Sequence, residues 1–236
     1  MDESGVTGEG KVIQVAVADA IAMAGSVSIK ISMTFWLVWA RIAFDHERRA
    51  RDARRAAEAA QANGERGAEF GEALGREMQD ALVAVSGCAH AVDAVYGAVK
   101  PGIPIPEATS DAWKRNRTPR QRQILETLKA GFAIDGKTVE RWLREFDWLD
   151  DLRDAVVHPE ERLDVPHPHP TGTNVAAASA TYTIEAAERA RRIVLEVFDR
   201  CTVSPRSAND EIVAWASRNR PAVETLLHEY DDGQSP

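Results

Sequence analysis

An arginine and a histidine, Arg153 and His158, stand five residues apart where a predicted helix ends. Arginine presents a fixed fork of donors to a phosphate or a carboxylate, and histidine exchanges protons near neutral pH. A helical projection of residues 142–158 places Arg153 in the middle of the apolar face, where an unpaired charge is costly to bury. The arginine therefore extends past the core to solvent, meets a carboxylate, or lines a binding site.

The residue after His158 decides where this helix ends. Pro159 disfavours the helical conformation of the residue before it, so His158 is predicted at the helix C-terminus. That position favours the protonated imidazole. On an unbroken helix Arg153 and His158 would point about 140° apart. The break in the helix lets the two side chains converge on one groove.

The segment Arg153-Asp154-Ala155-Val156-Val157-His158 resembles the R-x4-6-H motif of HEPN domains, which often place a polar residue after the arginine. The resemblance covers residues 35–201 and implies a dimeric helical bundle with its motif at the end of a late helix. It implies a metal-independent endoribonuclease of toxin–antitoxin or anti-phage systems, with RNA as substrate and an antitoxin as a protein partner. His158 would then act as general acid or base on a 2′-hydroxyl or leaving oxygen, and Arg153 would neutralise the phosphate. Asp154 would orient either side chain.

Two other arginine–histidine pairs in the chain have the same spacing. Arg41 and His46 lie inside a predicted helix that continues past them, and Arg162 and His167 lie in a Pro-rich loop. Only the pair at the helix end combines an adjacent aspartate with a preceding apolar helix. The context of that pair, more than its spacing, carries the resemblance.

A basic cluster spans the end of the Pro-containing segment 97–117 and the start of the next predicted helix: Lys114, Arg115, Arg117 and Arg120. The segment is predicted to be a long loop, and loops of this length are commonly functional or mobile. With Trp113 beside it, the cluster could contact RNA through phosphates and an aromatic ring; an ordinary surface loop is the alternative. The formal net charge of −8 opposes non-specific nucleic-acid binding but does not exclude a small basic site.

No metal or cofactor site is predicted. Three aspartates share the polar face of the 142–158 helix and are interpreted as a solvated surface: Asp147, Asp151 and Asp154. His167 and His169 could join His158 around a metal, but scattered histidines are common in Pro-rich loops. The sequence has no Gly-rich phosphate loop, zinc-type cysteine pair or serine nucleophile elbow.

Two long helices are predicted over residues 35–61 and 69–96. Their apolar seams and short Asn-Gly link predict an antiparallel pair. The charged stretch 45–61 is interpreted as a solvated face with i,i+4 ion pairs. The later elements are predicted at 118–132, 138–157, 184–201 and 210–230 as helices, the last as one or two, with a short strand at 180–183.

The region before the first long helix has two open interpretations. Apolar and polar residues alternate over 27–37, and this period-2 pattern predicts short strands. A helix through Ile13, Val17 and Ile21 is the competing interpretation. The uncharged runs within 12–44 are shorter than the roughly 20 apolar residues that cross a bilayer, so no membrane span is predicted.

The predicted fold is mainly α: an antiparallel helical bundle with a short N-terminal β segment, in one domain over 1–204 with a helical appendage and tail over 205–236. Cys88 and Cys201 lie in apolar helical patterns and are predicted to be buried free thiols, which favours the cytoplasm. If the apolar face that carries Arg153 meets a symmetry mate, the protein is a homodimer. Two functions stay open: a ribonuclease, or a catalytically inactive helical dimer that binds a protein or a nucleotide.

Overall fold

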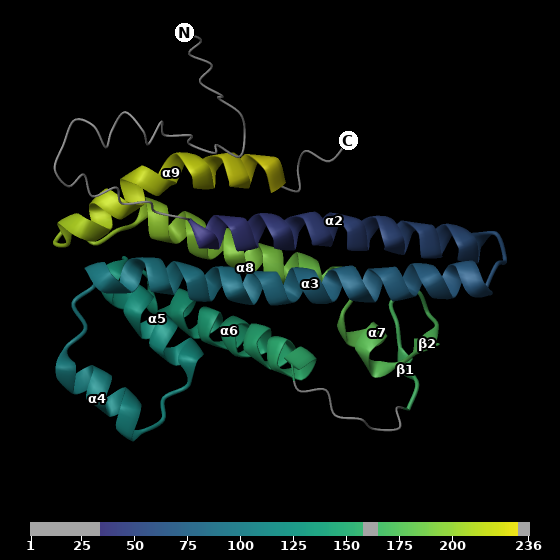
Figure 1. Cartoon of the computed structure of the whole chain (residues 1–236), viewed down its shortest axis with the longest axis horizontal. Coiled ribbons are helices and arrows are strands. Elements are labelled where there is room, and N and C mark those ends of the chain that lie inside the picture. Colours follow the sequence, from purple (N-terminus) through teal and green to yellow (C-terminus); the bar gives the residue numbers. More distant parts are fainter. Residues whose placement is uncertain (1–33, 158–164, 231–236) are drawn as a thin grey trace, which may run out of the picture. The chain divides into compact units, whose positions relative to one another are not determined.

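The computed structural model describes residues 34–157 and 165–230, which form a mainly helical bundle (Figure 1). The chain divides into two units, Met1–Met33 and Thr34–Pro236, and the described residues all belong to the second. The strands predicted over 27–37 fall mostly outside the described residues, and the prediction is wrong for 35–37, which are helical. The elements are α2 (Phe35–Ala62), α3 (Ala68–Val99), η1 (Lys100–Gly102), α4 (Glu107–Arg115), α5 (Arg120–Gly131), α6 (Gly136–Val157), β1 (His167–Pro168), β2 (Asn174–Val175), α7 (Ala177–Thr181), α8 (Ile184–Val203) and α9 (Asp210–Tyr230).

The long helices α2 and α3 pack side by side and antiparallel, which confirms the prediction (Figure 1). Small residues make this contact possible, because they let the two backbones approach closely. A Cβ added at Gly87 of α3 would lie 3.0 Å from the Cβ of Ala43 on α2. The other small buried residues of the pair include Ala40, Ala50 and Ala57 of α2 and Ala81, Ala84 and Ala91 of α3.

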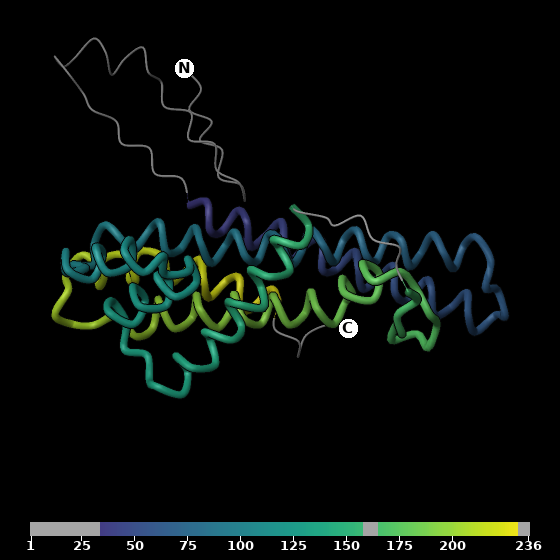
Figure 2. The backbone as a smooth tube through the Cα atoms, turned by 90° about the horizontal axis from the view of Figure 1, so that it is seen from below, coloured from purple at the N-terminus to yellow at the C-terminus, as the bar shows by residue number. Residues whose placement is uncertain are grey.

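The remaining helices cover this pair. α8 contacts both α2 and α3, and α9 packs on α8. α5 and α6 pack together against α3, which α6 crosses obliquely (Figure 2). α9 is a single helix with Pro221 inside it, and Ile212, Trp215 and Leu226 join the same buried core as the earlier helices. Helix α9, which belongs to the appendage predicted over 205–236, therefore packs onto the bundle.

Residues 97–117 are not the long loop that the prolines suggest. α3 continues to Val99, η1 follows, and α4 fills Glu107–Arg115. Trp113 is the one buried residue of α4, and its Nε1 donates a hydrogen bond to Oε2 of Glu126 on α5 at 2.6 Å. One apolar anchor in nine residues produces no helical period, which is why the sequence pattern missed this helix.

The strand predicted at 180–183 is also wrong. α7 occupies Ala177–Thr181, and the strands of the described region are the two-residue pair β1 and β2. They pair antiparallel, with His167 opposite Val175. Thr183 then precedes α8, whose start at Ile184 agrees with the sequence.

The charged stretch of α2 is a solvated face only in part. The ion pairs Arg48–Asp45 and Arg55–Asp52 lie on the surface, as predicted, although their spacing is i,i+3 and not i,i+4. Glu47 and Arg54, in contrast, are 2% and 7% exposed. α8 packs against this part of α2, so one side of the charged stretch faces the interior of the bundle.

Helix α6 begins with a side-chain cap and buries one face. Asp135 accepts hydrogen bonds from the backbone nitrogen of Thr138 at 3.0 Å and from its hydroxyl at 2.7 Å. The bond from the Thr138 nitrogen contributes most to holding the pKa of Asp135 below its ordinary value. Trp142, Phe146 and Leu149 are buried, as the helical projection predicts. The cap and the buried face together fix the orientation of the residues that follow.

Both cysteines are buried and free, as predicted. Burial raises the pKa of the Cys88 and Cys201 thiols, so neither is an accessible thiolate. The stretch Ala68–Gly102 is long and apolar enough to cross a membrane by length and composition alone, yet half of its most apolar window is buried. Since α3 contacts α2, α5, α6 and α8, we interpret it as the core helix of a bundle, which is consistent with a soluble protein.

Candidate functional site

Arg153 lies one turn before the end of α6, with 27% of its side chain exposed. Its Nη2 atom is 2.5 Å from Oδ1 of Asp150 and 2.8 Å from Oδ1 of Asp154. Of the three interpretations of this arginine, contact with a carboxylate is confirmed. The hydrogen bond to Asp154, more than the charge of Asp150, raises the pKa of Arg153.

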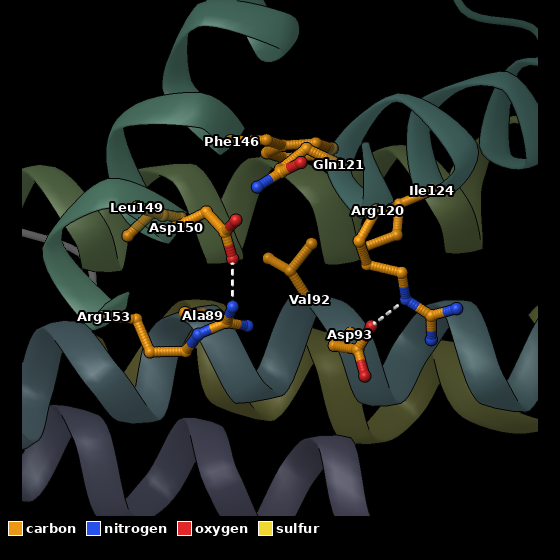
Figure 3. Close-up of a pocket in the computed structure, with 10 residues that line it drawn as sticks. All are labelled: Ala89, Val92, Asp93, Arg120, Gln121, Ile124, Phe146, Leu149, Asp150 and Arg153. Carbon is orange, nitrogen blue, oxygen red and sulfur yellow. Dashed lines mark hydrogen bonds and ion pairs between the residues drawn. The ribbon is translucent and has the colours of Figure 1, made fainter. Parts of the chain in front are cut away.

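Arg153 also lines a hollow between α3, α5 and α6 (Figure 3). A second ion pair closes the opposite side, where Nε of Arg120 donates to Oδ1 of Asp93 at 2.7 Å. The volume of the hollow is about 20 Å³, which is roughly the space for one water molecule. The hollow is therefore too small to enclose a phosphodiester group.

The carboxylate of Asp150 is more buried than its partner, since the side chain of Asp150 is 18% exposed and that of Arg153 is 27% exposed. Burial raises its pKa, the positive charge of Arg153 opposes that rise, and the negative charges of Asp154, Asp151 and Asp147 add to it. Asp150 was not among the residues singled out from the sequence. Its spacing of three from Arg153 on one helix was the available signal.

His90 of α3 is a second residue that sequence reasoning missed. Burial lowers its pKa, and the positive charge of Arg153 lowers it further, while Asp93 opposes the change. Its ring contacts the indole of Trp39 on α2, with 4.8 Å between ring centroids. A neutral imidazole near an arginine can accept a proton. The sequence held no signal for this neighbourhood, because Trp39, His90 and Arg153 come from three different helices.

The structure brings together two of the three residues in the predicted catalytic set, Arg153 and Asp154. His158 lies outside the described residues, so its distance from Arg153 stays a prediction. The two arginine–histidine pairs that served as comparisons can be followed in part. His46 lies in mid-helix and contacts Asp80 at 2.7 Å, and His167 lies in β1.

The four residues of the predicted RNA-binding cluster gather around the α4–α5 turn. Lys114 and Arg115 are in the last turn of α4, Arg117 is in the turn, and Arg120 begins α5. Lys114 contacts Asp111 at 3.3 Å. The guanidinium of Arg120 lies 4.1 Å from the ring centroid of Tyr96, in addition to its bond to Asp93. The cluster is thus one corner of the bundle, and Arg120 connects it to the hollow beside Arg153.

A buried ionic network lies at another part of the bundle. Arg54 of α2 donates to both carboxylate oxygens of Glu77 on α3, at 2.9 and 2.6 Å, and also contacts Glu185 on α8. Nε2 of His169 lies 3.7 Å from Glu77, and burial lowers the pKa of this histidine. These contacts join three helices to the β1–β2 segment, so we assign the network a structural role.

No group of three or more His, Cys, Asp or Glu side chains able to hold a metal is found within residues 34–157 and 165–230. Both ring nitrogens of His169 already have contacts. The hydroxyl of Thr171 lies 2.9 Å from Nδ1, and the carboxylate of Glu77 lies 3.7 Å from Nε2. The prediction that the protein uses no metal or cofactor stays a prediction.

Comparison with protein-family models, with curated proteins and with solved structures found no match. The resemblance to HEPN domains therefore rests on the sequence of residues 153–158 and on the place of Arg153 in the last turns of α6.

Proposed function

We propose that the chain is a HEPN-like, metal-independent endoribonuclease of the cytoplasm, of the kind found in toxin–antitoxin and phage-defence systems. Arg153 contacts the scissile phosphate, His158 transfers the proton, and Asp154 orients the arginine. The observation that carries the proposal is the position of Arg153. It is partly exposed in the last turns of α6 and shares the wall of one hollow with a second arginine, Arg120. Two guanidinium groups on one surface suit a phosphodiester whose charge increases in the transition state.

The direct test is cleavage of a broad panel of RNAs in the presence of EDTA. We expect products that end in a 2′,3′-cyclic phosphate, because the proposed step uses the neighbouring 2′-oxygen as nucleophile. The matched control is the same RNA with 2′-O-methyl groups, which lacks that nucleophile and should stay intact. Cleavage that EDTA abolishes, or cleavage of the methylated RNA at the same rate, would contradict this mechanism.

The proposed active form is a homodimer. Four side chains at helical spacing on the first two turns of α2 leave an apolar stripe exposed: Phe35 (55%), Val38 (46%), Trp39 (37%) and Ile42 (37%). Trp39 contacts His90, and the positive charge of Arg153 helps to lower the pKa of His90. The stripe therefore lies beside the candidate site. A second copy across this stripe would bring two copies of Arg153 and His158 close to one two-fold axis. An antitoxin or another protein partner is the alternative occupant.

Light scattering on the purified protein is expected to report a dimer at tens of micromolar. The double change Trp39→Glu with Ile42→Glu should give a monomer, because it places two charges in the buried centre of the interface. Val203→Glu is the matched control, since Val203 is an exposed apolar residue on α8. A wild-type monomer, or a dimer unaffected by the double change, would exclude this interface.

A second candidate function is a binding module without catalysis. One observation favours it: the guanidinium of Arg153 already holds two carboxylates, Asp150 and Asp154. These two carboxylates compete with a substrate phosphate for the guanidinium, and this competition reduces the affinity for the phosphate. Tight binding of RNA or of a protein partner without cleavage would decide for this function.

A further inference from the structure

A groove separates η1, α4 and the start of α5. We call it the cationic groove, after the three side chains on its rim, Lys100, Lys114 and Arg117. Its volume is about 690 Å³, within the range of about 300–1,000 Å³ that small-molecule sites occupy. It is much larger than the hollow beside Arg153, so a ligand can enter it.

The charge of this region is opposite to that of the chain. Residues 100–123 contain six lysines and arginines but only two acidic residues, Glu107 and Asp111, whereas the whole chain carries a formal charge of −8. Among the described residues, Asp111 is the one carboxylate within ion-pair distance of any rim cation, and its partner Lys114 is 78% exposed. The rim therefore offers positive charge to an anion from solution.

The floor of the groove is apolar and held in place. Ile103 and Trp113 are 4% and 8% exposed, and Ile105 packs beside them against the core. The indole of Trp113 is fixed by its hydrogen bond to Glu126 at 2.6 Å. An apolar floor below a cationic rim suits a ligand with a flat apolar part and a negative group. A nucleotide has both.

We propose that the cationic groove binds one nucleotide unit, with its phosphate at the rim and its base against Ile103, Ile105 and Trp113. The site adds Lys100 and an apolar floor to the RNA contacts expected of Lys114 and Arg117. This nucleotide-binding proposal does not depend on whether the chain cleaves RNA. The bound unit can be a free nucleotide or one residue of a strand, and the two sources differ in what else they contact.

Two cations beside the buried ring of Tyr96 lie between the groove and the hollow beside Arg153. The ammonium of Lys100 lies 5.2 Å from the centroid of that ring, and the guanidinium of Arg120 lies 4.1 Å from it. Arg120 also lines the hollow beside Arg153. A strand held in the groove would thus follow cations from Lys100 to Arg153, and such rows of cations guide single strands.

The test measures binding by calorimetry and fluorescence anisotropy, with AMP, ribose 5-phosphate and a 2′-O-methyl RNA oligonucleotide as probes. The oligonucleotide has no free 2′-hydroxyl, so failure of the proposed cleavage leaves this measurement unaffected. We expect AMP to bind more tightly than ribose 5-phosphate, because only AMP carries a base. Tighter binding of the oligonucleotide than of AMP would identify a strand as the ligand, and equal binding would identify a free nucleotide. The proposal would be overturned if neither AMP nor the oligonucleotide binds, or if AMP and ribose 5-phosphate bind with equal affinity.

Two rim substitutions complete the test. Lys114→Ala and Arg117→Asn should each weaken AMP binding by about tenfold, the effect of losing one charge-assisted hydrogen bond. Asparagine is chosen because Arg117 has φ 49°, a left-handed conformation that asparagine tolerates. Arg55→Ala and Lys137→Ala remove the same charge from other helices and should leave binding unchanged. Loss of binding in these controls as well, with unchanged circular dichroism, would show a general charge effect and no site.

Discussion

Replacing Arg54 with methionine is expected to lower the free energy of unfolding by about 3 to 5 kcal/mol, because it leaves a buried carboxylate without its partner. Arg54 is 7% exposed and Glu77 is 0% exposed. Glu77 receives two hydrogen bonds from Arg54, at 2.9 and 2.6 Å. Methionine keeps the apolar stem of the arginine, so the loss reports the charge and not a cavity.

The measurement is chemical denaturation followed by circular dichroism. Arg55→Ala is the matched control on the same helix, since Arg55 is 67% exposed and its pair with Asp52 is 3.8 Å long. A surface pair of this kind contributes about 0.5 kcal/mol or less. Equal effects of the two changes would contradict a buried network.

A compensating change makes the test sharper. Glu77→Gln removes the charge of Glu77 but keeps an oxygen for the backbone nitrogen of Ile184, which donates to Oε1 at 3.0 Å. The double variant Arg54→Met with Glu77→Gln should therefore be more stable than Arg54→Met alone. A double variant as unstable as the sum of the single changes would mean that the arginine stabilises through packing and not through charge.

The sequence predicted the long helices well and the tertiary environment of charged residues poorly. The boundaries of α2, α3, α6 and α8 follow from apolar periodicity together with Asn-Gly, Asp-Gly and Thr signals, which are local along the chain. Whether a charged residue of α2 faces solvent depends on α8, more than a hundred residues later. For that reason Arg54 and Arg55, neighbours in one charged stretch, were given one interpretation and have opposite environments.

The same limit applies to the candidate site. The contact of Arg153 with Asp154 was accessible from sequence because the two residues are adjacent. The contact with Asp150 follows a helical spacing and could have been found in the same way. The influence of Arg153 on His90, and the ion pair between Asp93 and Arg120, depend on how α3, α5 and α6 cross. No pattern along the chain encodes those crossings.

The largest effect on activity is expected at the predicted catalytic pair. His158→Ala and Arg153→Ala should each lower the rate of RNA cleavage by a factor of about 10² to 10⁴, the usual effect of removing one acid–base group or one donor to the developing charge. Arg153→Lys keeps the charge but loses the planar fork, and should retain an intermediate rate. Both alanine variants should keep the wild-type circular dichroism spectrum; the side chain of Arg153 is partly exposed and lies outside the buried core.

His46→Ala and His167→Ala are the matched controls, since each histidine stands five residues after an arginine. His46 lies in mid-helix on α2 and contacts Asp80, and His167 lies in β1, so neither has the helix-end setting of the motif. Both variants should cleave RNA at the wild-type rate.

His90→Ala distinguishes between two candidate bases, His90 and His158. If it abolishes cleavage while His158→Ala does not, the base is the neutral imidazole of α3 beside Arg153, and the role of His158 in the proposed mechanism is wrong. If Arg153→Ala cleaves normally, the arginine is a surface charge held by Asp150 and Asp154, and the HEPN-like mechanism is wrong even though the protein cleaves RNA.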